Sequence, residues 1–532
     1  MQIKADDDFI YLYGVPKGDE KMMERFFAAV PSKKGHWRMW RNRFVMRDLY
    51  KAFPGLRSDP HFLQLGREIQ LARDALFAVH KDTAPLSVPE LRPYQQQDAA
   101  ILAKLGSGGV FNDPRTGKTP TIITTIRTLN KLRNLIVCPA SLLYNWKQEV
   151  NAWWPECEVL VYDGPQKAKL LNAFGGVTWP QAIIISKDQV GKVNHMDFDT
   201  CVVDEAHYLR SHDTVQSKNT LSIKAQHKFA LTGTPTIKHP SDMYGLLKFL
   251  NPKRYPSYWQ FVNYFFNVRE RHDTGMLYAD DLKGYRAEEF QETVGLISTQ
   301  RKRKDVMPWL PEKERVRMVT TMTTKQKKLY HEMKKYFVAQ DEDHQIDVPN
   351  IITQLMRLRQ LSLDPRLLGF EEVGGKTKAV MEWLENNREP VIIMSMFTSY
   401  LMLLKKDIAK LGLKVGEIHG QMPNKEKHAA AGSFQAGRTD VLLCNIISAG
   451  TGFTLDRSTT VLFLDTAWNP SENEQAEDRI CPTNKDRLHK HYILNMVAAD
   501  SVDARMLEIL QRKQDLTAYI NEGGWKAAKG LV

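Results

Sequence analysis

Two stretches of the chain alternate short apolar runs with helical patterns of apolar and polar residues. The first extends from Leu91 to about Leu250, and the second begins at Pro390. Apolar runs bounded by polar or turn residues are typical of the buried strands of a parallel sheet, whose faces the helices cover. The pattern therefore predicts two α/β units. The runs of the first unit are residues 134–140, 181–186, 199–207 and 227–235, and those of the second are 390–397, 414–420, 439–445, 459–465 and 489–495.

The remaining segments have other compositions. Residues 1–85 are rich in aromatic and basic side chains and end in a stretch with two prolines, which indicates a boundary. Charged, helical patterns fill the segment between the two α/β units, so we expect a mostly helical insertion. The expected domains are an N-terminal accessory domain (1–85), a first α/β domain (86–250), the helical insertion (251–375), a second α/β domain (376–505) and a closing helix (506–532).

Size and composition limit the class of protein. The 532 residues exceed the roughly 250 to 300 that share a single core, so several packed units are expected. No apolar stretch approaches the roughly 18 residues of a membrane span, and no basic segment followed by an apolar one opens the chain. We therefore expect no membrane contact and no secretory signal. The five cysteines form no C-x-x-C pair, which favours reduced core thiols in a cytosol or nucleus. No chromatin-reading module is recognised in the sequence, so we expect the cytoplasm of a bacterial or phage-infected cell, or a nucleus if the source is eukaryotic.

The net charge of +12 favours a polyanionic partner. Many basic proteins bind no nucleic acid, so the charge matters only together with motifs that point the same way.

A phosphate-binding loop is indicated where an apolar strand leads into Thr116-Gly117-Lys118-Thr119 and then into a helical pattern. The backbone N–H groups of such a loop and of the following helix bind the phosphates of ATP; Lys118 would reach the β and γ oxygens, and Thr119 would ligate Mg²⁺. Asn112 stands where the usual motif has its first glycine, and asparagine tolerates a left-handed backbone less freely. Taken alone, the tetrapeptide is also compatible with an ordinary turn.

A second apolar strand ends in Asp204-Glu205-Ala206-His207. In open α/β sheets, ligands lie at the carboxyl ends of the strands, so Asp204 can hold the water shell of Mg²⁺ and Glu205 can act as general base toward the attacking water. His207 would link this pair to the next motif, in which Thr232 and Thr234 are placed to sense the γ-phosphate.

Together and in this order, the motifs resemble those of the superfamily-two helicase-like ATPases, and further strings narrow the resemblance to Swi/Snf-type DNA translocases over about residues 88–500. The resemblance implies two RecA-like parallel-sheet domains that bind one ATP between them. The strings that carry it are residues 91–95, 138–150, 232–252, 297–313 and 356–365, and then 391–404, 417–422, 445–455 and 462–479.

The resemblance also implies roles for single residues. Arg92 and Gln95 would lie at the adenine, whereas Gly452 and Asp456 would lie toward the ATP. Trp468 and Asn469 would act near DNA or couple it to the nucleotide, although a buried tryptophan in the core is an open alternative. Small hydroxyl and backbone donors suited to a phosphate backbone are Ser448, Gly450 and Thr451.

The last motif departs from the family pattern. Gln475 and Arg479 match Q-x-x-x-R-x-x-R, but Pro482 replaces the second arginine. The resemblance implies that Arg479 stabilises charge on the γ-phosphate, an effect worth about 10³ to 10⁵ in rate in related hydrolases. Lys485 or Arg487 could compensate for the missing arginine.

A motor that steps along DNA without regard to sequence contacts phosphates rather than bases. The candidate contacts are Ser141, Asn145 and Trp146, Lys187, Ser395, and Arg115 beside the phosphate loop. The basic run at 301–305 could contact DNA or form a solvated helix face.

The N-terminal region interleaves aromatic and basic side chains at Trp37, Arg38, Trp40, Arg41 and Arg43. Such a pattern suits stacking on unpaired bases together with phosphate contact. It faintly resembles the HARP-type modules of annealing helicases, which would imply forked or branched DNA. A small domain core with a basic surface is an equal alternative.

We therefore expect a monomeric, ATP- and Mg²⁺-dependent DNA translocase or helicase that acts on duplex DNA in replication, recombination or repair. Fork remodelling, branch migration and strand annealing are the specific tasks to consider. The alternatives are an RNA helicase and a nucleic-acid-binding regulatory protein with weak ATP turnover.

Overall fold

The computed structural model of the chain forms two compact units, Met1–Val306 and Met307–Val532. The structure describes residues 1–163, 180–236, 239–270, 275–310, 313–336, 338–340, 345–347, 351–449, 453, 455–467, 470–480, 490–504 and 507.

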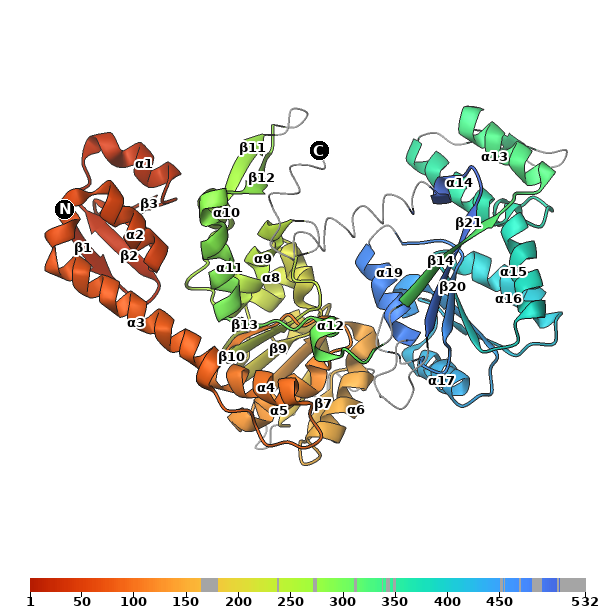
Figure 1. Cartoon of the computed structure of the whole chain (residues 1–532), viewed down its shortest axis with the longest axis horizontal. Coiled ribbons are helices and arrows are strands. Elements are labelled where there is room, and N and C mark those ends of the chain that lie inside the picture. The colour runs from red at the N-terminus through yellow and green to blue at the C-terminus, as the bar shows by residue number, and fades with distance from the viewer. Residues whose placement is uncertain are drawn as a thin grey trace. The chain divides into compact units, whose positions relative to one another are not determined.

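A parallel sheet forms the centre of the first unit (Figure 1). It has seven strands in the order β13-β5-β10-β9-β6-β8-β7. Its strands are β5 (Gly108–Val110), β6 (Asn134–Cys138), β7 (Val159–Val161), β8 (Ala182–Ser186), β9 (Asp197–Val203), β10 (Lys224–Leu231) and β13 (Ser298–Thr299). Because all these strands are parallel, the loops at their carboxyl ends share one edge of the sheet.

Both faces of this sheet are covered. On β6, Ile136 and Cys138 face one hydrophobic cluster, while Leu135 and Val137 face another. The first cluster includes side chains of α4 (Pro93–Leu105), α5 (Lys118–Leu129) and α6 (Leu143–Trp153). The second includes α9 (Met243–Leu250), and α8 (Val215–Leu221) contacts α9.

An N-terminal module, residues 1–82, packs on the same unit. It contains an antiparallel sheet of order β1-β2-β4-β3 with three helices. Its core residues belong to one hydrophobic cluster with Phe261 and Phe290 of the later segment. The expected linker is held on α4, since Leu86 N–H donates to Gln96 O at 3.3 Å and the Gln97 amide to Thr83 O at 2.9 Å. The elements are β1 (Gln2–Ala5), β2 (Phe9–Tyr13), α1 (Glu20–Arg25), β3 (Val30–Pro31), β4 (His36–Trp40), α2 (Arg43–Ala52) and α3 (Pro60–Asp82).

The segment that was expected to be a mostly helical insertion is divided between the units and contains strands as well as helices. Its first part carries α10 (Tyr258–Phe265), the hairpin β11 (Phe266–Glu270) and β12 (Leu277–Leu282), α11 (Ala287–Leu296), β13 and α12 (Arg303–Val306). Its second part begins with β14 (Lys313–Thr320), an edge strand of the second sheet. Most of β14 is exposed, and charged residues are common on exposed edge strands, so its charges do not distinguish it from a helix.

The second unit is built on a six-stranded parallel sheet of order β14-β21-β20-β17-β19-β18 (Figure 1). Alternate residues of β17 again face two clusters, with Ile392 on one side and Ile393 on the other. The strands are β14, β17 (Val391–Ser395), β18 (Val415–Ile418), β19 (Val441–Asn445), β20 (Thr460–Phe463) and β21 (His491–Ala498), beside the hairpin β15 (Val338–Gln340) and β16 (Gln345–Asp347). The helices are α13 (Thr324–Tyr336), α14 (Ile351–Leu363), α15 (Gly375–Asn386), α16 (Thr398–Ala409), α17 (Asn424–Gln435), α18 (Ile446–Ala449) and α19 (Pro470–Glu477).

Two parallel α/β sheets confirm the predicted fold class. Cysteines 138, 157, 201 and 444 are buried and free. Among the residues that the structure describes, no helix is both long and apolar enough to cross a membrane.

Candidate active site

The phosphate loop connects β5 to α5 at the carboxyl edge of the first sheet. Gly117 adopts φ 76°, and a Cβ at this position would clash with the side-chain amide of Gln95, so only glycine fits. Arg115 is also left-handed, with φ 67°, whereas Asn112 is not among the residues with positive φ. The strain that the sequence suggested at Asn112 is therefore absent, and the left-handed non-glycine residue of the loop is Arg115.

The loop curls around the side chain of Lys118. Its Nζ donates to the carbonyls of Asn112 and Asp113 at 3.0 and 3.1 Å, and the hydroxyl of Thr116 donates to the carbonyl of Asp113 at 2.8 Å. Lys118 and Thr119 are the first residues of α5, and the first-turn N–H groups and the dipole of a helix favour an anion. The arrangement provides a cation and backbone donors at one point.

Asp204 and Glu205 follow β9, two strands from β5 in the sheet. Burial raises the pKa of Asp204 to about 6, and the neighbouring charge of Glu205 adds to the effect. The oxygens of Asp204 accept from Trp146 Nε1 at 2.9 Å and from Glu205 N–H at 2.8 Å. A buried carboxylate whose charged form is disfavoured in this way suits a divalent cation, which would supply the compensating charge.

Contacts through His207 join Asp204 and Glu205 to the end of β10, the strand that lies between β5 and β9. His207 Nδ1 lies 3.2 Å from Glu205 Oε2 and 3.4 Å from Thr232 Oγ1. Thr232 follows β10 and donates its N–H to Val110 O at 3.2 Å, and a Cβ on Gly233 would come within 2.9 Å of Pro114. Three adjacent strands thus bring the phosphate loop, Asp204 and Thr232 to one edge; Thr234 donates its N–H to Thr232 Oγ1 at 3.1 Å.

The family string at 91–95 lies beside the phosphate loop. The Gln95 amide donates to Thr116 O and Gly117 O at 3.1 and 3.3 Å, and its oxygen accepts from Arg92 N–H at 2.9 Å. Tyr94 also donates to Thr116 O, at 2.7 Å. In this structure Gln95 braces the loop, and its contact with an adenine stays a prediction, as does that of Arg92.

In the second unit the expected residues are partly described. Arg479 contacts the segment of the preceding motif in two ways. Its guanidinium donates to Phe453 O at 3.4 Å, and its backbone carbonyl accepts from Leu455 N–H at 2.9 Å. Asp456 accepts from Gln435 at 2.7 Å, Ser448 is half-buried, and Gln475 lies on α19. Gly450, Thr451, Gly452, Trp468, Asn469 and Pro482 lie outside the described residues.

The sequence model of the SNF2-related domain matches residues 46–367, more than half of the chain. The chain belongs to the SNF2-related family. The model of the helicase conserved C-terminal domain matches residues 375–481.

Relatives have low sequence identity to this chain. YwqA of Bacillus subtilis is 23% identical over 574 residues, which cover 97% of this chain and 58% of that protein. An uncharacterized ATP-dependent helicase of Mycoplasma pneumoniae is 25% identical over 81% of this chain and 42% of its own length. The DNA annealing helicase and endonuclease ZRANB3 of Homo sapiens is 23% identical over 82% of this chain and 40% of its own length. The chain thus spans about half the length of the curated relatives it matches.

Among solved structures, the SWI2/SNF2 ATPase core of Sulfolobus solfataricus in complex with double-stranded DNA is similar. It has 20% sequence identity and a TM-score of 0.40, and it covers 83% of this chain and 95% of that one.

Several predicted DNA contacts of this SNF2 chain are engaged elsewhere. Trp146 is 1% exposed and is bonded to Asp204, so it is not available to DNA. Ser395 is fully buried, and its hydroxyl accepts from Phe397 N–H at 3.1 Å. Ser141, Asn145 and Lys187 are half-buried at the carboxyl ends of neighbouring strands β6 and β8, so their role stays a prediction.

The N-terminal aromatic and basic residues mostly hold the module in place. The ring of Trp40 is 3% exposed, packs at 4.6 Å on Tyr264 and donates to Arg254 O at 2.9 Å. Arg43 pairs with Glu288 and Glu292 at 2.9 and 2.5 Å, and Arg41 with Glu68 at 3.1 Å. Trp40 is therefore too buried to stack on a base, whereas contacts of Arg41 and Arg43 with DNA stay predictions. A run of aromatic and basic residues looks the same in sequence whether its cations contact DNA or pair with carboxylates of a distant helix.

Trp37 and Arg38 of the same strand are half-buried, and Arg38 stacks at 4.6 Å over the ring of Phe9. Their contact with DNA stays a prediction.

Three buried charges that the sequence did not reveal contact segments that carry or precede predicted site residues. Asp98 on α4 contacts Asn112 and Arg301, and in the second unit Arg359 and Lys376 contact the segment before Trp468. The only sequence signal was a charged residue within an apolar helix pattern, as in the run at 98–102.

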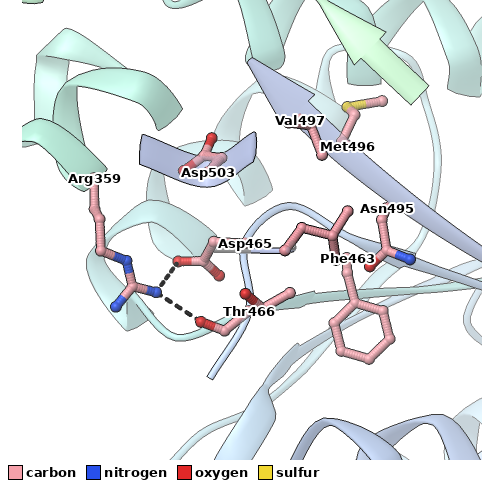
Figure 2. A pocket seen from close by; sticks show the side chains of 9 residues that line it. Arg359, Phe463, Asp465, Thr466, Asn495, Met496, Val497 and Asp503 are labelled. Atoms are coloured by element: carbon pink, nitrogen blue, oxygen red, sulfur yellow. Dashed lines mark hydrogen bonds and ion pairs between the residues drawn. The ribbon is translucent and has the colours of Figure 1, made fainter. Parts of the chain in front are cut away.

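Figure 2 shows how the segment before Trp468 is supported. Arg359 donates to Thr466 O at 2.7 Å and lies 3.6 Å from the buried carboxylate of Asp465. These residues line a cavity of about 10 Å³ beside Asp503. Asp503 accepts from Lys376 at 2.6 Å, and Lys376 also donates to Leu464 O at 2.5 Å. The same segment is also bonded to α19, because the side-chain amide of Asn473 accepts from Ala467 N–H at 2.8 Å and donates to Ala467 O at 2.9 Å.

Proposed function

We propose that this chain is a nucleic-acid-stimulated ATPase that couples ATP hydrolysis to movement along duplex DNA. One observation carries the proposal: adjacent strands of a SNF2-family sheet place the loop around Lys118, the buried Asp204 with Glu205, and Thr232 at a single edge. A phosphate-binding cation, a metal-binding carboxylate and a general base are the groups that phosphoryl transfer to water requires.

Each residue has a distinct task in this proposal. Bound Mg²⁺·ATP supplies the phosphoryl group that is transferred and the charge that polarises it. Lys118 donates to phosphate oxygens, Thr119 and Asp204 hold the metal, and Glu205 accepts a proton from water. His207 touches both Glu205 and Thr232, so it can report the state of the phosphate from one motif to the next.

The DNA track is supported by charge and by relatives. The net charge of +12 favours a polyanion, and Ser141, Asn145 and Lys187 follow the carboxyl ends of the paired strands β6 and β8. The name of human ZRANB3 describes a DNA annealing helicase. We therefore propose forked DNA as a substrate to test beside duplex DNA, with fork remodelling, branch migration or strand annealing as the task.

The test is the ATPase rate of the full chain with no nucleic acid, duplex DNA, single-stranded DNA, forked DNA and RNA, together with displacement of a triplex-forming strand from duplex DNA. We expect duplex or forked DNA to raise turnover at least about tenfold and Lys118→Ala to lose at least about 100-fold. Lys81→Ala, which removes an exposed lysine at the end of α3, should keep the wild-type rate.

Each other outcome contradicts a part of the proposal. Equal stimulation by RNA would favour an RNA helicase. ATP hydrolysis without displacement of the triplex-forming strand would contradict the proposed movement along duplex DNA. No nucleotide turnover in any arm would leave a nucleic-acid-binding regulatory protein.

We further propose that Arg479 takes part in hydrolysis as the one arginine of its motif. Arg479→Ala should lower DNA-stimulated turnover about 1,000-fold while DNA affinity stays the same. Turnover near that of the wild type would show that the assignment is wrong.

A further inference from the structure

A short segment at the end of the first unit lies along the entry to the phosphate loop. We call residues 297–303 the strap; it includes β13, which pairs with β5 in parallel. The backbone hydrogen bonds between the two segments continue beyond the ends of both strands, so the strap is bonded to residues as far along the chain as Asp113. Backbone bonds run from Gly109 N–H to Ile297 O at 2.8 Å, from Phe111 N–H to Thr299 O at 2.9 Å and from Asp113 N–H to Arg301 O at 2.9 Å.

Side chains join the strap to the loop a second time. Arg301 donates to Asp98 Oδ1 through two nitrogens, at 2.9 and 2.7 Å, and Asn112 donates to Asp98 Oδ2 at 2.9 Å. Asp98 is fully buried, whereas 34% of the Arg301 side chain is exposed. Arg303 N–H also donates to the carboxylate of Asp113 at 2.7 Å. One buried carboxylate therefore connects the strap to Asn112, and the next loop residue is bonded to the strap directly.

Asn112 and Asp113, which the strap fixes in this way, also bind the ammonium of Lys118. The carbonyls of Asn112 and Asp113 both accept from its ammonium. A displacement of the strap would move both carbonyls and, with them, the cation that meets the phosphates. The packing leaves little slack, because a Cβ on Gly108 would come within 2.7 Å of Ile297 O.

We propose that Arg301 is a positioning residue for the phosphate loop and, through Asp98 and Asn112, sets the affinity of the site for nucleotide. This inference rests on the proposed function, because it concerns the same site. The first unit ends at Val306, three residues after the strap, so the chain leaves this unit directly after the segment that is bonded to Asp113. The sequence was compatible with either a DNA contact or a solvated helix face for the basic run at 301–305. In the proposal, this run includes an arginine that positions the phosphate loop.

The test measures the Kd of the full chain for a fluorescent ADP analogue in the presence of Mg²⁺, together with KM and kcat for ATP. Arg301→Ala should raise Kd and KM about tenfold, and Arg301→Lys should raise them less because a cation remains beside Asp98. Asn112→Ala should weaken binding in the same direction, and the double variant should be no weaker than Arg301→Ala alone, since both act through one carboxylate. Lys304→Ala removes an exposed charge from the same run and should leave Kd unchanged.

A purely structural role has a different signature. It would lower the Tm of Arg301→Ala and leave the Kd of the folded protein within twofold of wild type, which would overturn the proposal. If Arg301→Ala does not fold, unchanged Kd values for both Arg301→Lys and Asn112→Ala would overturn it as well. A wild-type chain that fails to bind the analogue would refute the proposed function, whereas equal binding by wild type and variants would refute only the role of Arg301.

Discussion

Each of the two parallel sheets carries a loop that the proposed activity needs, and each supports it with buried charge from a distant part of the sequence. Asp98 in the first unit serves Asn112 and Arg301, and the arginine keeps a third of its side chain exposed. In the second unit Arg359 and Lys376 are 3% and 0% exposed against Asp465 and Asp503. Removing either cation leaves a buried carboxylate without its partner, but part of Arg301 is already in contact with solvent, whereas Arg359 and Lys376 are shut off from it. We call the second support, whose cations are buried, the rigid support.

The largest expected effect is on the rigid support. Lys376→Met leaves Asp503 buried without its cation and should lower the free energy of unfolding of the second unit by about 3 to 5 kcal/mol. Urea denaturation measures the change. Lys378→Ala on the same helix, where the side chain is 59% exposed, should change it by less than about 0.5 kcal/mol. Equal effects of the two variants would contradict the comparison.

Trp146→Phe should affect the first unit through function more than through stability. The variant keeps an aromatic ring but removes the N–H that Asp204 accepts, a bond to a charged group worth about 1.5 to 3 kcal/mol. We expect the Mg²⁺ concentration for half-maximal binding of ADP to rise about tenfold, as measured by titration with Mg²⁺. Trp153→Phe on the same helix is the control and should bind as the wild type does.

The rigid support should also show a pH dependence. Burial raises the pKa of Asp465 to about 6, against about 3.9 in an unfolded chain. Between pH 4 and 6 the folded state keeps a proton that the unfolded state has lost, so this group stabilises the fold at low pH and the effect disappears as pH rises through 6. The wild type should gain about 1 kcal/mol over Asp465→Asn between pH 7 and pH 5 in urea denaturation. A constant difference between the two proteins would refute the assignment.

The smallest expected effect concerns Asn112. Asn112→Gly restores the common loop pattern but removes the bond to Asp98, and the backbone here has no positive φ that glycine could relieve. The free energy of unfolding should fall by about 0.5 kcal/mol. A gain in stability would mean that the asparagine is strained after all.

The sequence alone was enough for the parts of the site whose geometry is local. A strand, a loop and a helix that follow one another directly place Gly117, Lys118 and Thr119, and a strand end places Asp204 and Glu205. These arrangements depend on neighbours in the chain, and the residue types show them. The family assignment followed from their order.

Only the tertiary structure decided which polar side chains are left for a ligand. Trp146 and Trp40 carry the residue types of a nucleic-acid contact, yet they bond to Asp204 and Arg254, which lie 58 and 214 positions away. Arg301 sits in a run that looks solvated, yet it reaches Asp98 across 203 positions. Burial and the choice of partner depend on which distant segments pack together, because desolvation makes each buried polar group take the nearest partner that the fold provides.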